Sequence, residues 1–345
     1  MKKMLILVAV VSLVAGFSFA DEDVLIDFGL LTADTHVAVG PNDNSDTPNQ
    51  NERTLMDFAN VRFTGSFTED QKAAMKTSLA IENWEVDLSS SSRTIHNMVN
   101  SYTKEAPSRQ FGKVMGVRVH FPLENFNAAA LVRPPFEIPA YEYPANADGT
   151  PQDTPSDTKT RFEEGRGLLK NVGTIKSLQV AVYGLNFPHG LWTHIIDEKG
   201  ISRRVFMGYL NYDGWGELRW DNPQYVQQVR NRDLRLYPLY PDSMPFIKLA
   251  AFEITRDSQH SGGDFITYFK DVKVIYDKAV LDTDRDIDDE ALWKIIDARE
   301  TARRLWQMER FGQNQVIRYI DQQKQAPETD FRPRSEGQQQ PQSNR

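Results

Sequence analysis

The sequence of 345 residues contains no cysteine. This absence excludes a disulfide framework, a thiol nucleophile and cysteine-ligated zinc or iron–sulfur sites. Basic residues are in the minority, with 40 Lys and Arg against 48 Asp and Glu, so the formal net charge is −8. A protein that binds nucleic acid through phosphates needs a basic surface, and we therefore expect no nucleic-acid partner.

Motifs of catalysis and cofactor binding are also missing. The sequence has no G-x-S-x-G elbow, no H-E-x-x-H, no P-loop and no G-x-G-x-x-G. The six histidines never occur four residues apart, the spacing at which a helix directs two rings towards one metal. We expect neither an enzyme nor a cofactor. A glycan-cleaving enzyme needs only two suitably placed acids, so the 48 acids leave it open as a less favoured alternative.

Long apolar runs are confined to the N-terminus. Lys2 and Lys3 precede an apolar stretch over 4–16, and Ser18 and Ala20 place small residues before the acidic Asp21. This layout predicts that residues 1–20 are a cleaved signal peptide, with an uncleaved anchor as the alternative. No later stretch is long enough to span a membrane as a helix, so we expect an exported protein without a membrane span after cleavage.

Residues 21–281 have the pattern of short strands. Every second residue is apolar over 24–28, 117–121 and 178–182, and the run 265–276 closes the series with Val272, Val274 and Tyr276 on one side. The run 246–254 is apolar on both faces and predicts a central strand. Turn sequences such as Asp213-Gly214 separate these runs. The pattern predicts a mainly β domain, an antiparallel β-sandwich. The same strands also resemble carbohydrate-binding jelly rolls, and this resemblance implies a jelly-roll-like arrangement.

Residues 282–325 predict a helical C-terminal segment. Apolar residues recur there at helical spacing, Asp288 is a candidate N-cap, and Gly312 is expected to end the first helix before a second one over 315–325. The first helix has two alternative roles, packing on the sandwich or contacting a partner. The polar residues 326–345 predict a disordered tail.

A ladder of acids leads into this helical segment at Asp282, Asp284, Asp286 and Asp288. The spacing resembles the start of a calcium loop, but isoleucine occupies the glycine position and tryptophan occupies the position of the last glutamate. We therefore favour a solvated linker over a calcium site and predict no metal ligands.

Aromatic residues crowd into one short segment. The five are Trp192, Tyr209, Tyr212, Trp215 and Trp220. Such rings either fill a sandwich core or stack on sugar faces, and we expect mostly core. Tyr212 and Trp215 flank Asp213-Gly214, so they are the candidate contacts with a ligand or partner, on the expectation that a turn exposes them.

Six blocks of this sequence resemble one known family. The blocks are 116–122 (GVRVHFP), 134–141 (PPFEIPAY), 172–176 (VGTIK), 182–186 (VYGLN), 209–215 (YLNYDGW) and 269–274 (FKDVKV). They are similar to the outer-layer (sheath) proteins of spirochaete periplasmic flagellar filaments, over about residues 21–277.

The resemblance implies a structural protein of the periplasm that coats the flagellin core of a filament and tunes its shape and stiffness for motility. The implied partners are flagellin core proteins, contacted directly or through their glycans, and copies of itself or other sheath proteins. The family implies no catalytic residues. The alternative function is a periplasmic, non-catalytic carbohydrate-binding module, which the sandwich pattern shares only as a fold.

Overall fold

A computed structural model describes residues 21–31, 56–58, 60–63, 68, 76–77, 79–123, 127–139, 172–197, 200–225, 234–236, 240–241, 247–281 and 286–330. The predicted signal peptide over 1–20, Asp282, Asp284 and residues 331–345 of the predicted tail lie outside these ranges.

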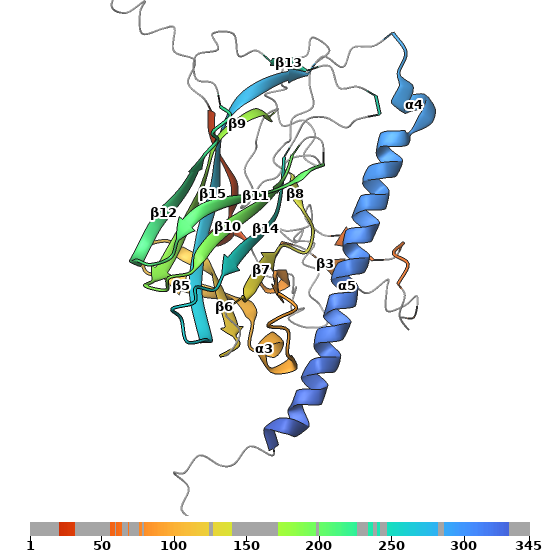
Figure 1. The fold of residues 1–345 in the computed structure, drawn as a ribbon. Helices are drawn as coiled ribbons and strands as arrows, with labels where there is room; N and C mark the ends of the chain where they lie inside the picture. Colours follow the sequence, from red (N-terminus) through yellow and green to blue (C-terminus); the bar gives the residue numbers. More distant parts are fainter. Residues whose placement is uncertain are drawn as a thin grey trace, which may run out of the picture.

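Two antiparallel sheets form a sandwich, as the alternating pattern predicted (Figure 1). Sheet I has the order β12 (Asp213–Asp221), β9 (Val172–Leu185), β15 (Gly263–Leu281), β6 (Gly112–Phe121) and β5 (Tyr102–Ser108), and β1 (Asp21–Asp27) and β13 (Leu234–Leu236) also pair with β15. Sheet II has the order β11 (Ser202–Tyr209), β10 (Gly190–Ile196), β14 (Lys248–Thr255), β7 (Ala129–Arg133) and β4 (Glu85–Leu88), and β8 (Ile138–Pro139) also pairs with β14. A separate pair joins β2 (Met56–Asp57) to β3 (Lys76–Thr77).

The chain crosses repeatedly from one sheet to the other. It passes from β4 in sheet II to β5 and β6 in sheet I, returns to β7, and later runs from β9 to β10 and β11 and back to β12. These crossings make sequence neighbours cover each other across the core, which is the jelly-roll-like arrangement that the sequence predicted.

Strand β15 keeps an apolar inner face along 19 residues by means of a β-bulge. Phe265 and Phe269 face inward before the bulge, and Val272 and Val274 face inward after it. The odd and even positions therefore exchange faces at Lys270, the extra residue, whose ammonium forms an ion pair with Asp27. Strict alternation would have turned half of these side chains into solvent.

Large aromatic side chains join the two sheets at the centre of the sandwich. Phe252 from sheet II stacks on Phe269 from sheet I, with ring centroids 5.0 Å apart, and Trp84 and Phe28 meet edge to face at 5.0 Å. All four are essentially unexposed. Burying one such side chain stabilises the fold by about 1.5–3 kcal/mol.

The described helical elements are few. Two short 3-10 helices, η1 (Phe28–Leu30) and η3 (Ile81–Asn83), and the five-residue α3 (Ile95–Val99) lie beside the sandwich, and α4 (Asp289–Trp293) leads into α5 (Ile295–Asp330). Asp288 caps α4 as predicted, because its carboxylate accepts a hydrogen bond from the Ala291 amide at 3.0 Å. Lys294, in the left-handed conformation, separates α4 from α5.

The prediction that Gly312 ends a helix is wrong, since α5 is continuous from Ile295 to Asp330. It also continues past residue 325, where we expected the helical segment to end. Gly312 is present for packing instead: a Cβ atom there would lie 2.3 Å from Cε1 of Phe63. The aromatic ring occupies the space that any larger side chain would need.

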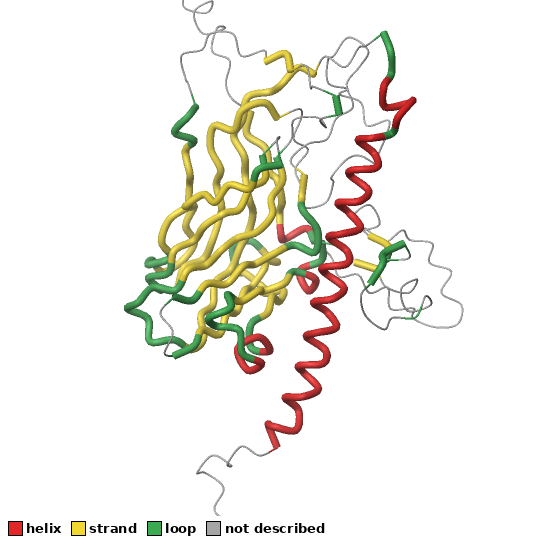
Figure 2. The backbone as a smooth tube through the Cα atoms, turned by 45° about the vertical axis from the view of Figure 1, so that its right-hand side comes forward, coloured by secondary structure: helices red, strands yellow, loops and turns green. Residues whose placement is uncertain are grey.

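Helix α5 runs alongside the sandwich and projects beyond its lower end (Figures 1 and 2). Met308 and Phe311 are buried on its inner side, and ion pairs link Arg310 to Glu85 at 2.8 Å and Arg303 to Glu137 at 2.7 Å. Among the described helices, none combines the length and apolar character needed to cross a membrane.

Candidate functional site

Three aromatic side chains form a row across the outer face of sheet I. Trp215 on β12 pairs with Tyr183 on β9, which pairs with Tyr268 on β15. Their half-buried rings meet edge to face, with centroids 5.3 Å and 5.9 Å apart. Gly116 on β6 is the next position, and Tyr268 lies against it, since a Cβ at 116 would be 3.3 Å from that ring. We call Trp215, Tyr183 and Tyr268 the aromatic row.

The tip of the β5–β6 hairpin reaches the β12 end of the row. Phe111 in this tip contacts Trp215 edge to face at 4.9 Å, although β5 and β12 lie at opposite edges of sheet I. Strand β6 pairs with β15 only from Met115 onward, which frees the tip to cross the outer face. Phe111 therefore bounds the aromatic row at one end.

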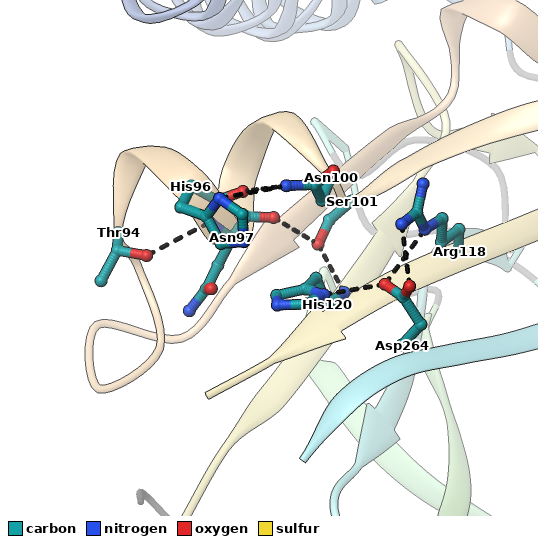
Figure 3. A network of polar contacts seen from close by, with 8 residues as sticks. All are labelled: Thr94, His96, Asn97, Asn100, Ser101, Arg118, His120 and Asp264. Carbon is teal, nitrogen blue, oxygen red and sulfur yellow. Dashed lines mark hydrogen bonds and ion pairs between the residues drawn. The ribbon is translucent and has the colours of Figure 1, made fainter. Parts of the chain in front are cut away.

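An ionic cluster lies further along β6 and β15 on the same face as the row, and Figure 3 shows its three side chains. Arg118 donates two hydrogen bonds to the Asp264 carboxylate, at 3.1 Å and 2.8 Å, and Nδ1 of His120 lies 2.8 Å from the same carboxylate. The hydrogen bond from Arg118 lowers the pKa of Asp264 below its usual range, so this carboxylate is charged at neutral pH. We call Arg118, His120 and Asp264 the polar cluster.

Helix α3 is attached beside the polar cluster through hydrogen bonds. Ser101 accepts a hydrogen bond from the backbone amide of His120 at 2.9 Å and donates one to the carbonyl of Asn97 at 2.7 Å (Figure 3). Thr94 caps the helix by accepting a bond from the Asn97 amide. These contacts hold the end of β6 in place, while the side chains of the polar cluster stay partly exposed.

The two predicted contact residues lie on opposite faces of sheet I. Trp215 points outward within β12, which already begins at Asp213, so the expected turn at Asp213-Gly214 is wrong. Tyr212 packs on the inner side, over Gly184 and Gly216, and its hydroxyl donates a hydrogen bond to the Val182 carbonyl at 3.1 Å. Burial raises the pKa of Tyr212 to about 12. The structure brings Trp215, not Tyr212, together with other outward aromatic rings.

The other aromatic residues of the segment divide between the core and the surface. Trp220 packs against the core as expected, whereas Tyr209 is 55% exposed. Trp192 lies on the outer face of sheet II, where the Arg204 guanidinium sits 3.7 Å from its ring centroid. Arg204 also binds Glu253 through two hydrogen bonds, at 2.6 Å and 2.9 Å. Arg204 therefore covers one face of the Trp192 ring.

A second candidate surface lies on α5. Ile295, Trp306 and Ile317 are spaced by eleven residues, which is close to three helical turns, so they share one face. This face is exposed, with Trp306 at 60% and Ile317 at 41%, and Ile320 adjoins it. The buried Met308 lies about 200° around the helix from Trp306. We call Ile295, Trp306, Ile317 and Ile320 the apolar stripe.

The described residues do not assemble a metal centre. Within the ranges that the structure describes, no group of three or more His, Asp or Glu is placed to hold an ion. His189 is fully buried, and burial lowers its pKa to about 3, with a further contribution from His260. Its Nδ1 accepts the Asp257 amide at 3.1 Å, which is a structural role.

Solved structures with some likeness to this chain include sugar-binding proteins. One, described as a carbohydrate-binding module of the β-sandwich superfamily, is 9% identical, with a TM-score of 0.30 and coverage of 63% of each chain. A family 11 carbohydrate-binding module from Clostridium thermocellum is 8% identical, with a TM-score of 0.25 and coverage of 59% of this chain and 91% of that one. These scores are too low to carry an argument about function.

Proteins matched by sequence are far more similar to this chain than these solved structures are. The family model of the flagellar filament outer layer protein FlaA matches residues 47–285. Proteins of that name are 46% identical in Treponema pallidum, over 96% of this chain and 97% of the relative, and 42% identical in Spirochaeta aurantia, over 91% and 90%. A third, from Borreliella burgdorferi, is 30% identical over 74% of this chain and 72% of the relative. The resemblance in the strand blocks is thereby confirmed, and this chain belongs to the flagellar filament outer layer protein family.

Proposed function

We propose that this protein is a non-catalytic subunit of a coat around the flagellin core of a periplasmic filament, where it tunes the shape and stiffness of the filament. The signal peptide over 1–20 directs its export to the periplasm and is then cleaved. Its partners in the coat are core subunits and neighbouring copies of itself or other sheath proteins. Family membership supports a place in the filament's outer layer.

The observation that carries this proposal is the apolar stripe of α5. Exposed apolar side chains scattered singly are normal, but four that recur on one face of a single helix indicate a surface that another molecule covers. Met308 and Phe311, on the opposite side of α5, already pack on the sandwich, and the Arg310–Glu85 ion pair adds a second attachment. The helix can therefore present the stripe to a partner without detaching from its own domain.

Such contacts offer a physical route to stiffness. Each coat subunit that touches its neighbours or the core resists their relative displacement, and many weak contacts in parallel add up along a polymer. A helix attached rigidly to a sandwich also loses less conformational entropy on binding than a flexible tail does, so each such contact is stronger.

Co-sedimentation with purified flagellin-core filaments tests the proposal. We expect saturable pelleting of the mature protein, weakened by Trp306→Ser. Leu123→Ser is the matched control, because Leu123 is also highly exposed but lies on a loop of the sandwich. Absence of pelleting by the wild-type protein would overturn the coat proposal, and equal pelleting of both variants would remove the stripe from it.

A periplasmic carbohydrate-binding role without catalysis is the second candidate. It is favoured by one observation, the aromatic row with the polar cluster beside it. Both roles are compatible, because a coat subunit could bind glycans that are attached to the core.

A further inference from the structure

The outer face of sheet I carries more aromatic surface than the sandwich needs. The core is already filled from the inner faces, where Phe265, Phe269 and Phe252 are essentially unexposed. The aromatic row lies on the other side of the same strands, half in solvent. Packing of the two sheets therefore does not explain it.

The backbone beneath the row is suited to flat rings. Gly116 has no side chain at the position next to Tyr268, and Tyr268 extends over that position. An alanine Cβ would lie 3.3 Å from the ring and 3.1 Å from the Lys104 carbonyl, so a larger residue would displace the tyrosine. The glycine thus extends the aromatic surface from β15 towards β6.

Hydrogen-bonding groups lie one step along the strands from the rings. Arg118 and Tyr102 form the next cross-strand pair beyond Gly116, with the Arg118 guanidinium 5.8 Å from the Tyr102 ring centroid. Asp264 and His120 pair one step further. The three side chains of the polar cluster are 22–44% exposed, so donors and acceptors face solvent beside the rings.

This combination selects one class of ligand. The faces of a pyranose ring present C–H groups that stack on aromatic rings, while its rim presents hydroxyls that need both donors and acceptors. An aliphatic protein surface would offer no hydrogen-bond partners to the charged groups of the polar cluster. A phosphate ligand would meet the Asp264 carboxylate, and the net charge of the whole chain is −8.

The outer face of sheet II is less suited to a sugar than that of sheet I. Trp192 also points outward, but Arg204 lies on its ring at 3.7 Å and is held there by Glu253. Burial alone would raise the pKa of Glu253, yet hydrogen bonds from Arg204 and His194 hold it below its usual value, so the pair is charged. A sugar would have to displace this ion pair, which is costly.

We propose that the outer face of sheet I binds a saccharide, with a pyranose ring stacked on the aromatic row and its hydroxyls bonded to Arg118 and Asp264. This inference rests on the second candidate function and does not depend on the coat. Of the two residues predicted as contacts, only Trp215 belongs to this site, because Tyr212 packs inward. Tyr183 and Tyr268 supply the other two rings.

The experiment measures binding of the mature protein to immobilised oligosaccharides of neutral hexoses, N-acetylhexosamines and uronic acids, together with glycans released from flagellin cores. We expect saturable binding to at least one probe, weakened about tenfold or more by Trp215→Ala and by Tyr183→Ala. Trp192→Ala is the matched control, and we expect it to bind like the wild type. Thermal unfolding of each variant verifies that the sandwich is intact.

Three outcomes would overturn the saccharide site: no binding to any probe, binding that survives both substitutions, or equal weakening by Trp192→Ala. Pelleting with deglycosylated cores that is lost in Trp215→Ala would also overturn it, because the row would then be a protein interface. The coat proposal fails separately, through loss of wild-type pelleting, so the two failures can be distinguished.

Discussion

The sandwich and helix α5 expose opposite kinds of surface. In the sandwich, most aliphatic side chains face inward and charged ones pair on the outside, as with Arg118 and Asp264, while the aromatic row is half-buried on the outer face of sheet I. Of the thirteen large apolar side chains that are exposed in the described structure, seven lie between residues 287 and 320, four of them on α5 and three in the segment that leads into it. The sandwich is thus complete as a folded unit, whereas α5 presents a surface that a partner would complete.

The largest expected effect concerns the core of the sandwich. Phe252→Ala removes a ring that stacks on Phe269 and should lower the free energy of unfolding by about 3–5 kcal/mol. Trp306→Ala, a truncation of similar size on α5, should change it by no more than about 0.5 kcal/mol. Denaturant unfolding of both variants measures the contrast, and similar losses would contradict the division between the two regions.

The attachment of α5 to the sandwich should respond almost as strongly. Arg310→Ala leaves Glu85, whose side chain is only 3% exposed, without its guanidinium partner, and the expected loss is about 3 kcal/mol. Arg304→Ala is the control, since Arg304 is exposed on the same helix and should contribute little. Limited proteolysis measures how readily α5 detaches from the sandwich in each variant. Equal cleavage in both variants would show that the ion pair does not hold the helix.

Stability of the sandwich should depend on pH through His189. Its folded-state pKa of about 3 lies below the unfolded value of about 6.5, so the unfolded state binds more protons between these limits. The contribution of neutral His189 to the free energy of unfolding is therefore fully present above about pH 6.5. It falls as the pH drops, by up to about 1.4 kcal/mol per pH unit. Urea unfolding from pH 7 to pH 4 measures the slope, and His189→Gln should flatten it. An unchanged slope in that variant would assign the dependence to other groups.

The smallest effect concerns Gly312. Gly312→Ala forces Phe63 to move, which costs about 1–3 kcal/mol, while better helix propensity returns about 1 kcal/mol. The expected net loss is about 0–2 kcal/mol. Combining it with Phe63→Leu should restore most of the difference, because the smaller side chain leaves room for the Cβ. Stabilisation by Gly312→Ala alone would mean that the glycine has no packing role.

Local sequence patterns predicted most of the sandwich. Alternation over 117–121 and 178–182 correctly placed Val119 and Val180 inward, and the apolar run ending at Ile254 correctly predicted a central strand. The bulge at Lys270 was not predictable in the same way, because it depends on pairing with strands far away in the sequence. The same limit applies to Gly312, since the ring that requires a glycine there belongs to Phe63.

The candidate surfaces were only partly predictable. Alternation on β6 already implied that Arg118 and His120 face solvent, but the register that places Trp215 beside Tyr183 and Tyr268 comes from three-dimensional pairing. Tyr212 and Trp215 are three residues apart and looked equivalent beside Asp213-Gly214. One lies over glycines on the inner side, and the other points out of a strand. The eleven-residue spacing of the apolar stripe was visible in the sequence, yet only the structure shows that this face is exposed.

Site-specific photo-crosslinking from position 306 in intact filaments tests the coat proposal most directly. A crosslinking residue at 306 should capture a core subunit or a neighbouring coat subunit, whereas the same residue at position 201, which is exposed on the sandwich, serves as the reference. The coat proposal predicts efficient capture from 306 and much less from 201. Capture from 201 with none from 306 would contradict the claim that α5 faces the rest of the filament.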